Sequence, residues 1–264
     1  MPEAYETITL ERPQPHVLVV TLDRPQAANA MNTQMGHDLT AVFEPFQTDL
    51  QDVRCIVVTG RGDRAFCGGA DLKERNGMSD ADWQAQHGVY ERMVRAMTAC
   101  PLPTIAAVNG AAFGGGAEIA GACDFVYAAS TARFGQPEVS LGIIPGAGAT
   151  QNLARAMGER RAKEVILAGE AFTAEEAAQW GFVNRVCTPE ALMAEVLKTA
   201  ARIAANAPIA VRQAKQAISR GLQMSIWDGL SFEIEAYNRT VPTEDRREGI
   251  LAFNEKRKPA FKGR

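Results

Sequence analysis

Two glutamates are the residues of this sequence whose types and spacing could best support catalysis. Glu118 follows three glycines, Gly114–Gly116, and lies among alanines and an isoleucine, where an ionised carboxylate would be costly without partners. Glu138 follows a proline and precedes an apolar run, so it could be sheltered as well. Two nearby carboxyl groups push their pKa values apart, which suits general acid–base chemistry. A buried ion pair for Glu118 and an exposed loop position for Glu138 are the alternatives.

Glycine-rich turns could supply backbone donors beside these carboxyl groups. The three glycines open a predicted helix, so free N–H groups and the positive end of the helix dipole could face a developing negative charge. A second turn, Ala65–Glu74, contains Gly68 and Gly69 and has Asp71 as the predicted N-cap of a helix. A tight turn that binds no ligand is the alternative. The dinucleotide-binding fingerprint is not matched, because Ile119 stands where its third glycine would be.

The composition excludes several other classes of function. The 264 residues are 46% hydrophobic and 22% charged with a net charge of −3, which predicts a globular protein without the positive field that attracts nucleic acid. The five cysteines are scattered and the three histidines lie beside no nucleophile motif, so no metal site, disulfide framework or serine-type triad is predicted. Residues 1–6 do not resemble a secretion signal and no apolar segment could span a bilayer, so we expect a cytoplasmic protein that binds no membrane.

Strands and helices must alternate to position these residues. Apolar patterning and turn residues predict strands at 5–10, 17–22, 55–59, 104–108 and 125–128. Periodicity predicts helices after Asn32, at 79–97, 115–122, 149–157, 159–168 and 173–180, and almost throughout from residue 189. Asn32, Ser79 and Thr173 are the predicted capping residues of three of them. We therefore expect an α/β core over residues 1–200 and a helical region over residues 201–264.

Several motifs in the same order resemble the crotonase family, and within it enoyl-CoA hydratase. They are Phe66–Leu72, Asn109–Glu118 and Phe134–Gly148, and the similarity extends over nearly the whole chain. The resemblance implies a spiral of ββα units with a helical C-terminal extension. It also implies a homo-oligomer, a trimer or a dimer of trimers, assembled through the C-terminal region.

The resemblance also implies a role for individual residues. The family binds acyl-CoA thioesters and holds the thioester oxygen with two backbone N–H groups, which fall here on Ala70 and Gly115. In a hydratase, Glu118 would activate the water that attacks C3 and Glu138 would handle the proton at C2, with no metal or other cofactor because CoA is part of the substrate. Further substrate contacts are implied for Ala28, Ala30, Asp71, Leu72 and Lys73, and for Phe253 and Lys256 from a neighbouring subunit.

Other interpretations stay open. Gln26 stands where relatives often carry Lys or Arg near the CoA phosphates, which puts one charge contact in doubt. The fold also serves isomerases and hydratases of branched or aromatic acyl-CoAs, although both glutamates together favour hydration. An RNA- or partner-binding relative is a third possibility, disfavoured by the modest net charge. Residues 239–264 carry eight basic and four acidic side chains, which could meet phosphates or form a solvated face. We expect acyl-chain preference to depend on residues 74–90.

Overall fold

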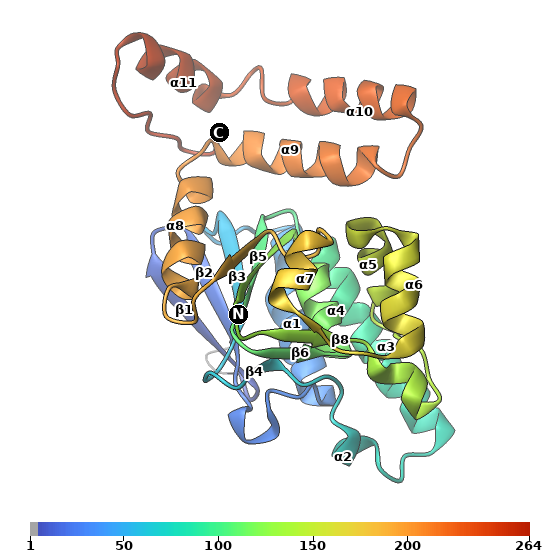
Figure 1. The fold of residues 1–264 in the computed structure, drawn as a ribbon. Coiled ribbons are helices and arrows are strands. Elements are labelled where there is room, and N and C mark those ends of the chain that lie inside the picture. The colour runs from blue at the N-terminus through green and yellow to red at the C-terminus, as the bar shows by residue number, and fades with distance from the viewer. Residues whose placement is uncertain (1–4) are drawn as a thin grey trace.

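Two β-sheets with covering helices form the body of the protein, and a helical arm projects from it (Figure 1). The computed structural model describes residues 5–264; residues 1–4, part of the segment used to predict a cytoplasmic location, lie outside the described residues. The strands of the larger sheet are β1 (Ile8–Gln14), β2 (Val17–Leu22), β3 (Cys55–Gly60), β5 (Thr104–Val108), β7 (Phe125–Ala129) and β10 (Arg185–Cys187). Their order is β1-β2-β3-β5-β7-β10, and within it only β1 and β2 pair antiparallel.

A smaller sheet is made from the short strands that follow those of the larger one. Its strands are β4 (Ala65–Cys67), β6 (Ala111–Phe113), β8 (Arg133–Gly135) and β9 (Phe172–Thr173), in the order β4-β6-β8-β9. Three successive turns of the chain, β3–β4, β5–β6 and β7–β8, each give one strand to the larger sheet and one to the smaller before a helix follows. This repeat confirms the predicted spiral of ββα units.

The helices of the body begin and end close to the predicted positions. They are α1 (Thr33–Phe43), α2 (Leu72–Arg75), α3 (Asp80–Thr98), α4 (Gly115–Ala122), α5 (Ala149–Met157), α6 (Glu159–Ala168), α7 (Ala174–Gln179) and α8 (Leu192–Ala204). Asn32, Ser79 and Thr173 each accept a hydrogen bond from a backbone N–H of the first helical turn, which satisfies a donor that has no partner inside the helix. Short 3-10 helices lie at Pro25–Ala27, Glu44–Gln47 and Pro137–Leu141.

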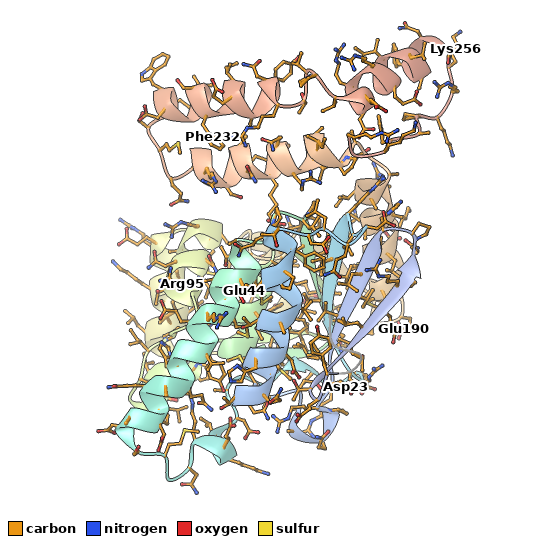
Figure 2. The ribbon with its side chains drawn as sticks, turned by 180° about the vertical axis from the view of Figure 1, so that it is seen from behind. Asp23, Glu44, Arg95, Glu190, Phe232 and Lys256 are labelled. Carbon is orange, nitrogen blue, oxygen red and sulfur yellow. The ribbon has the colours of Figure 1, made fainter. Side chains whose placement is uncertain are left out.

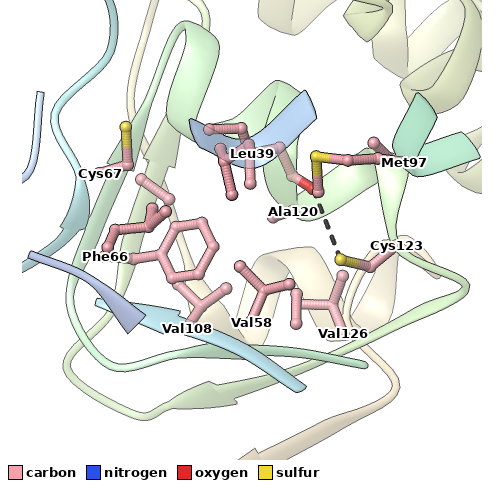
Figure 3. Packing of buried hydrophobic residues seen from close by; sticks show 14 of the residues in the cluster. Leu39, Val58, Phe66, Cys67, Met97, Val108, Ala120, Cys123 and Val126 are labelled. Carbon is pink, nitrogen blue, oxygen red and sulfur yellow. Dashed lines mark hydrogen bonds between the residues drawn. The ribbon is translucent and has the colours of Figure 1, made fainter. Parts of the chain in front are cut away.

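The central strands β2, β3 and β5 of the larger sheet are buried along their whole length. On one face, Val58, Val108 and Val126 from three neighbouring strands belong to the main core together with Phe66 (Figure 3). On the other face, Val57 and its neighbours pack against α8. Because successive side chains of a strand point to opposite faces, each central strand contributes to both cores.

The C-terminal arm consists of α9 (Pro208–Gly221), α10 (Ile226–Asn238) and α11 (Glu244–Asn254) (Figure 1). Lys215 attaches it to the body, since its ammonium donates to the Leu102 carbonyl at 2.8 Å and lies 2.7 Å from the Asp124 carboxylate. The predicted boundary near residue 200 falls inside α8, so the arm begins only after that helix. Among residues 5–264, no helix has the length and apolar content needed to cross a membrane.

Candidate active site

One cleft gathers both glutamates and both glycine-rich turns. Its walls come from the turn after β4, from α2 and α3, from the N-terminus of α4, and from the 3-10 helix Pro137–Leu141 with the loop that follows it. The predicted site residues on these walls are Ala70, Leu72, Gly115, Glu118 and Glu138. The fold therefore brings together groups that lie in three separate segments of the sequence.

Two backbone amides border this cleft without an acceptor. The turn around Ala70 is fixed on both sides, because Met31 N–H donates to the Gly69 carbonyl at 2.7 Å and Asp71 N–H donates to the Met31 carbonyl at 2.8 Å. Gly115 is the first residue of α4, where an N–H has no partner within the helix. Among the described residues, neither the Ala70 nor the Gly115 nitrogen donates a hydrogen bond. A methyl group on Gly115 would lie 3.7 Å from the Ala70 nitrogen, so the two amides are close neighbours.

Glycine is required at position 114, where the second turn passes the Glu138 carboxylate. Gly114 has a φ of 48° and a ψ of −121°, a backbone conformation that side chains rarely adopt. A Cβ atom there would also stand 2.9 Å from Glu138 Oε1. The glycine thus lets the start of α4 and this carboxyl group lie against each other.

Glu118 is buried, with 4% of its surface exposed, and its partners are backbone amides. Its Oε1 accepts hydrogen bonds from the N–H groups of Ala147 at 2.7 Å and Ala149 at 3.1 Å. Burial raises the pKa of Glu118, while these two donors and the positive charge of Arg75 act in the opposite direction. The alternative of a direct ion pair is not observed for Glu118 within residues 5–264.

Glu138 is also buried, at 8% exposed, rather than on an exposed loop. Burial raises its pKa to about 7, and the charge of Glu118 adds to the shift. The buried side chain of Gln136, which the sequence did not indicate as a site residue, lies beside it. With its nitrogen turned toward Glu138, the Gln136 amide donates to both carboxylate oxygens at 2.9 and 3.0 Å. The opposite orientation offers an oxygen to the protonated carboxyl, so this amide can serve either protonation state.

The raised pKa of Glu138 predicts that Glu138→Gln stabilises the protein at alkaline pH. The ordinary pKa is 4.5, so between pH 4.5 and about 7 the unfolded chain releases this proton before the folded chain does. The free energy of unfolding of the natural protein therefore falls through that window, by an amount on the order of 2 kcal/mol. Urea unfolding of both proteins at pH 5 and pH 8 should show the variant gaining stability at pH 8.

At pH 5 the two proteins should differ much less, because the natural Glu138 is then neutral in the folded state. For the hydration that the family resemblance implies, kcat of the variant should fall by at least about a hundredfold. The variant should therefore be more stable at pH 8 but much less active. Equal stability differences at both pH values would contradict the raised pKa.

The predicted substrate-binding residues Ala28, Ala30 and Asp71 lie beside the cleft, where two segments of the chain are connected by hydrogen bonds and an ion pair. The Asp71 side chain caps α2 and forms an ion pair with Arg24 at 2.9 Å. Arg24 in turn donates to the Ala30 carbonyl at 2.6 Å, and Gly68 N–H donates to the Ala28 carbonyl at 2.9 Å. This carboxylate therefore holds two segments together at the edge of the cleft.

The remaining predicted substrate contacts lie outside the cleft. Lys73 borders a smaller hollow next to it, which Leu72 also lines. Phe253, 83% exposed, belongs to α11, and Lys256 follows that helix at the end of the arm (Figure 2). Neither is part of the cleft wall of its own chain. Their predicted contact with the substrate of a neighbouring subunit stays a prediction.

Four cleft residues from α2 and α3 were not identified as site residues from the sequence. They are Arg75, Trp83, His87 and Tyr90. The last three are spaced as one face of a helix, which by itself indicates only a packed face. All four residues fall within residues 74–90, the segment expected to govern acyl-chain preference. Their place in that segment is the one sequence feature that could have identified them as site residues.

Comparisons with known proteins agree with the fold and identify the family. The model of the family described as enoyl-CoA hydratase/isomerase matches residues 12–264. A Bacillus subtilis protein named as an enoyl-CoA hydratase/isomerase is 46% identical, covering 94% of this chain and 95% of its own. A crotonyl-CoA hydratase from Syntrophomonas wolfei is 40% identical, covering 98% of both chains. The crystal structure of an enoyl-CoA hydratase from Bacillus anthracis has a TM-score of 0.96 and 40% identity, covering 98% of this chain and 100% of that one. This chain belongs to the enoyl-CoA hydratase/isomerase family.

Proposed function

We propose that the protein adds water reversibly across the 2,3 double bond of a 2-enoyl-CoA thioester, giving a 3-hydroxyacyl-CoA. The observation that carries this proposal is the meeting, in one cleft, of two free amide donors and two buried carboxyl groups in different surroundings. The name of the Syntrophomonas relative, a crotonyl-CoA hydratase, supports a short enoyl-CoA as the first substrate to test.

In this proposal the amides of Ala70 and Gly115 bind the thioester oxygen. Attack at C3 moves electrons through the conjugated system onto that oxygen, which becomes enolate-like. Donors already aimed at the oxygen stabilise this charge without reorganisation, and one such donor is typically worth about 2.7–4 kcal/mol in the transition state. Both donors belong to the backbone, so exchanging the Ala70 side chain for another small one should matter little.

The two carboxyl groups divide the proton transfers between them. Glu118, whose charged form accepts two amide N–H groups, takes a proton from the attacking water as its oxygen bonds to C3. Glu138, with a pKa of about 7, is neutral in part of the population at neutral pH and gives its proton to C2. Proton exchange with solvent then resets both groups. The step uses no metal, and CoA enters as part of the substrate.

The direct test is an absorbance assay with crotonyl-CoA. Hydration removes the conjugated enoyl thioester, so its absorbance should fall on addition of enzyme. A 3-enoyl-CoA should produce no conjugated absorbance, whereas an isomerase would generate it. If micromolar enzyme turns over no enoyl-CoA of several chain lengths, the hydratase proposal is wrong. An RNA- or partner-binding role would then no longer be disfavoured.

We propose that the arm joins copies of this chain into the expected trimer or dimer of trimers. Large apolar side chains lie exposed along it: Leu222 at 79%, Ile226 at 70%, Trp227 at 76% and Ile234 at 56%. Apolar patches of this kind mark protein–protein contacts. A second copy would cover them, and α11 would then bring Phe253 and Lys256 to a neighbouring cleft.

Trp227→Glu should therefore weaken the oligomer, because it places a charge in the proposed contact. Light scattering behind size exclusion should show a lower mass than for the natural protein. Gln84→Glu adds the same charge on the exposed side of α3 and should leave the mass unchanged. If the natural protein is already monomeric, the assembly proposal is wrong.

A further inference from the structure

Arg75 is a buried cation in the cleft wall that the proposed reaction does not use. Only 9% of its surface is exposed. Its guanidinium carbon lies 4.2 Å from the centre of the Trp83 ring and 5.5 Å from that of Tyr90, and both rings line the cleft. The guanidinium therefore belongs to the same wall, at the border between the cleft and the smaller hollow beside it.

Most of the hydrogen-bonding capacity of this guanidinium is unused. Its Nε donates to Gln86 Oε1 at 2.8 Å, but within residues 5–264 its two terminal nitrogens have no acceptor and no carboxylate within 4.0 Å. An arginine is a permanent cation in proteins, and the terminal nitrogens of Arg75 are not fully enclosed, so a ligand in the cleft can reach them. In a purely structural position one would expect Asp or Glu beside it.

The position is nevertheless firmly built. Gln86, which holds Nε, is itself fixed because its amide nitrogen donates to Thr33 Oγ1 and to a carboxylate oxygen of Glu74, both at 2.8 Å. Stacking on an aromatic ring and one strong hydrogen bond orient the guanidinium while leaving its outer edge free. This arrangement holds a cation ready for a ligand.

The chemistry of the surrounding wall indicates what that ligand is. Leu72, Leu141 and Ile143 line the cleft beside Arg75 and suit methylene groups. A carboxylate matches the planar fork of a guanidinium with two parallel hydrogen bonds. Without a cation, an anionic acyl chain would be repelled by Glu118. Arg75 lies near enough to Glu118 to lower the pKa of that carboxyl, so it also offsets this repulsion.

We infer that Arg75 binds a carboxylate at the end of the acyl chain, so that the preferred substrates are 2-enoyl-CoA thioesters of dicarboxylic acids. The inference rests on the proposed function, because it specifies the substrate class of the same cleft. Arg75 is then a specificity-determining residue that touches the substrate.

The test compares pairs of substrates that differ by one charge. The probes are trans-2-enoyl-CoA thioesters with five- and six-carbon acyl chains, each ending in either a carboxylate or a carboxamide. For at least one length, kcat/KM of the natural protein should favour the carboxylate by about tenfold or more. Arg75→Met should reduce this ratio by about 10- to 100-fold, and Arg75→Lys should retain part of it.

A matched control is Arg95→Met, which removes the same charge from the exposed outer side of α3, where Arg95 pairs with Glu91 (Figure 2). Its carboxylate-to-carboxamide ratio should equal that of the natural protein. Thermal unfolding shows whether each variant is folded, and Arg75→Lys keeps the test available if Arg75→Met is not.

Three outcomes would overturn the inference. The natural protein could turn over both members of every pair equally. Arg75→Met could slow both members equally, as expected if Arg75 only supports the fold. It could also raise KM for both members equally, as expected if Arg75 contacts the CoA phosphates. Turnover of crotonyl-CoA by the natural protein is the control for the hydratase proposal itself. If that proposal fails, no thioester reacts; if only the inference about Arg75 fails, crotonyl-CoA is still hydrated.

Discussion

Replacing Glu118 by glutamine should lower kcat for hydration of crotonyl-CoA by at least about a hundredfold, with a far smaller change in KM. The amide oxygen of glutamine can still accept the N–H groups of Ala147 and Ala149, so the loop around them should stay in place. The amide nitrogen, however, cannot take a proton from water. The variant thus removes the basic carboxylate but keeps a side chain of nearly the same size and shape.

Steady-state rates and a thermal unfolding curve are the measurements for this variant. Glu175→Gln, the same chemical change at an exposed position on α7, should keep the rate of the natural protein. Near-full activity of Glu118→Gln would remove this residue from the mechanism. A raised KM with unchanged kcat would instead assign it to substrate binding.

Gly115→Pro should lower kcat/KM by about 10²- to 10³-fold, because proline has no N–H to offer the thioester oxygen. Position 115 is the first residue of α4, where proline is well tolerated in helices. The substitution therefore deletes one proposed oxyanion donor with limited cost to the helix. Initial rates with crotonyl-CoA, together with circular dichroism of the variant, measure the effect.

Gly115→Ala is the matched control because it adds carbon at the same place but keeps the N–H. Its methyl group would meet Met31 Cε at 2.8 Å, and the end of a methionine side chain can move away. Alanine should consequently cost much less activity than proline. If the two variants were equally active, the Gly115 amide would have no role in the oxyanion hole.

The positions of the helices and of most strands of the larger sheet were determined largely by the sequence itself, whereas the short strands of the smaller sheet were not predicted. Asn32, Ser79 and Thr173 cap the helices that they were predicted to cap, and α4 spans the predicted residues 115–122. These signals depend on atoms within one or two turns of the chain, so they can be read without the fold. The order of the motifs likewise indicated the family.

The surroundings of the catalytic candidates were decided only by the tertiary structure. The sequence left open whether Glu118 would pair with an arginine and whether Glu138 would be exposed. The fold instead gives Glu118 the amides of a loop about thirty residues away, and it buries Glu138 beside Gln136. It also places Arg75 in the cleft wall. Burial, pKa and hydrogen-bond partners depend on segments distant in sequence, and local patterns carry no information on which distant segments will meet.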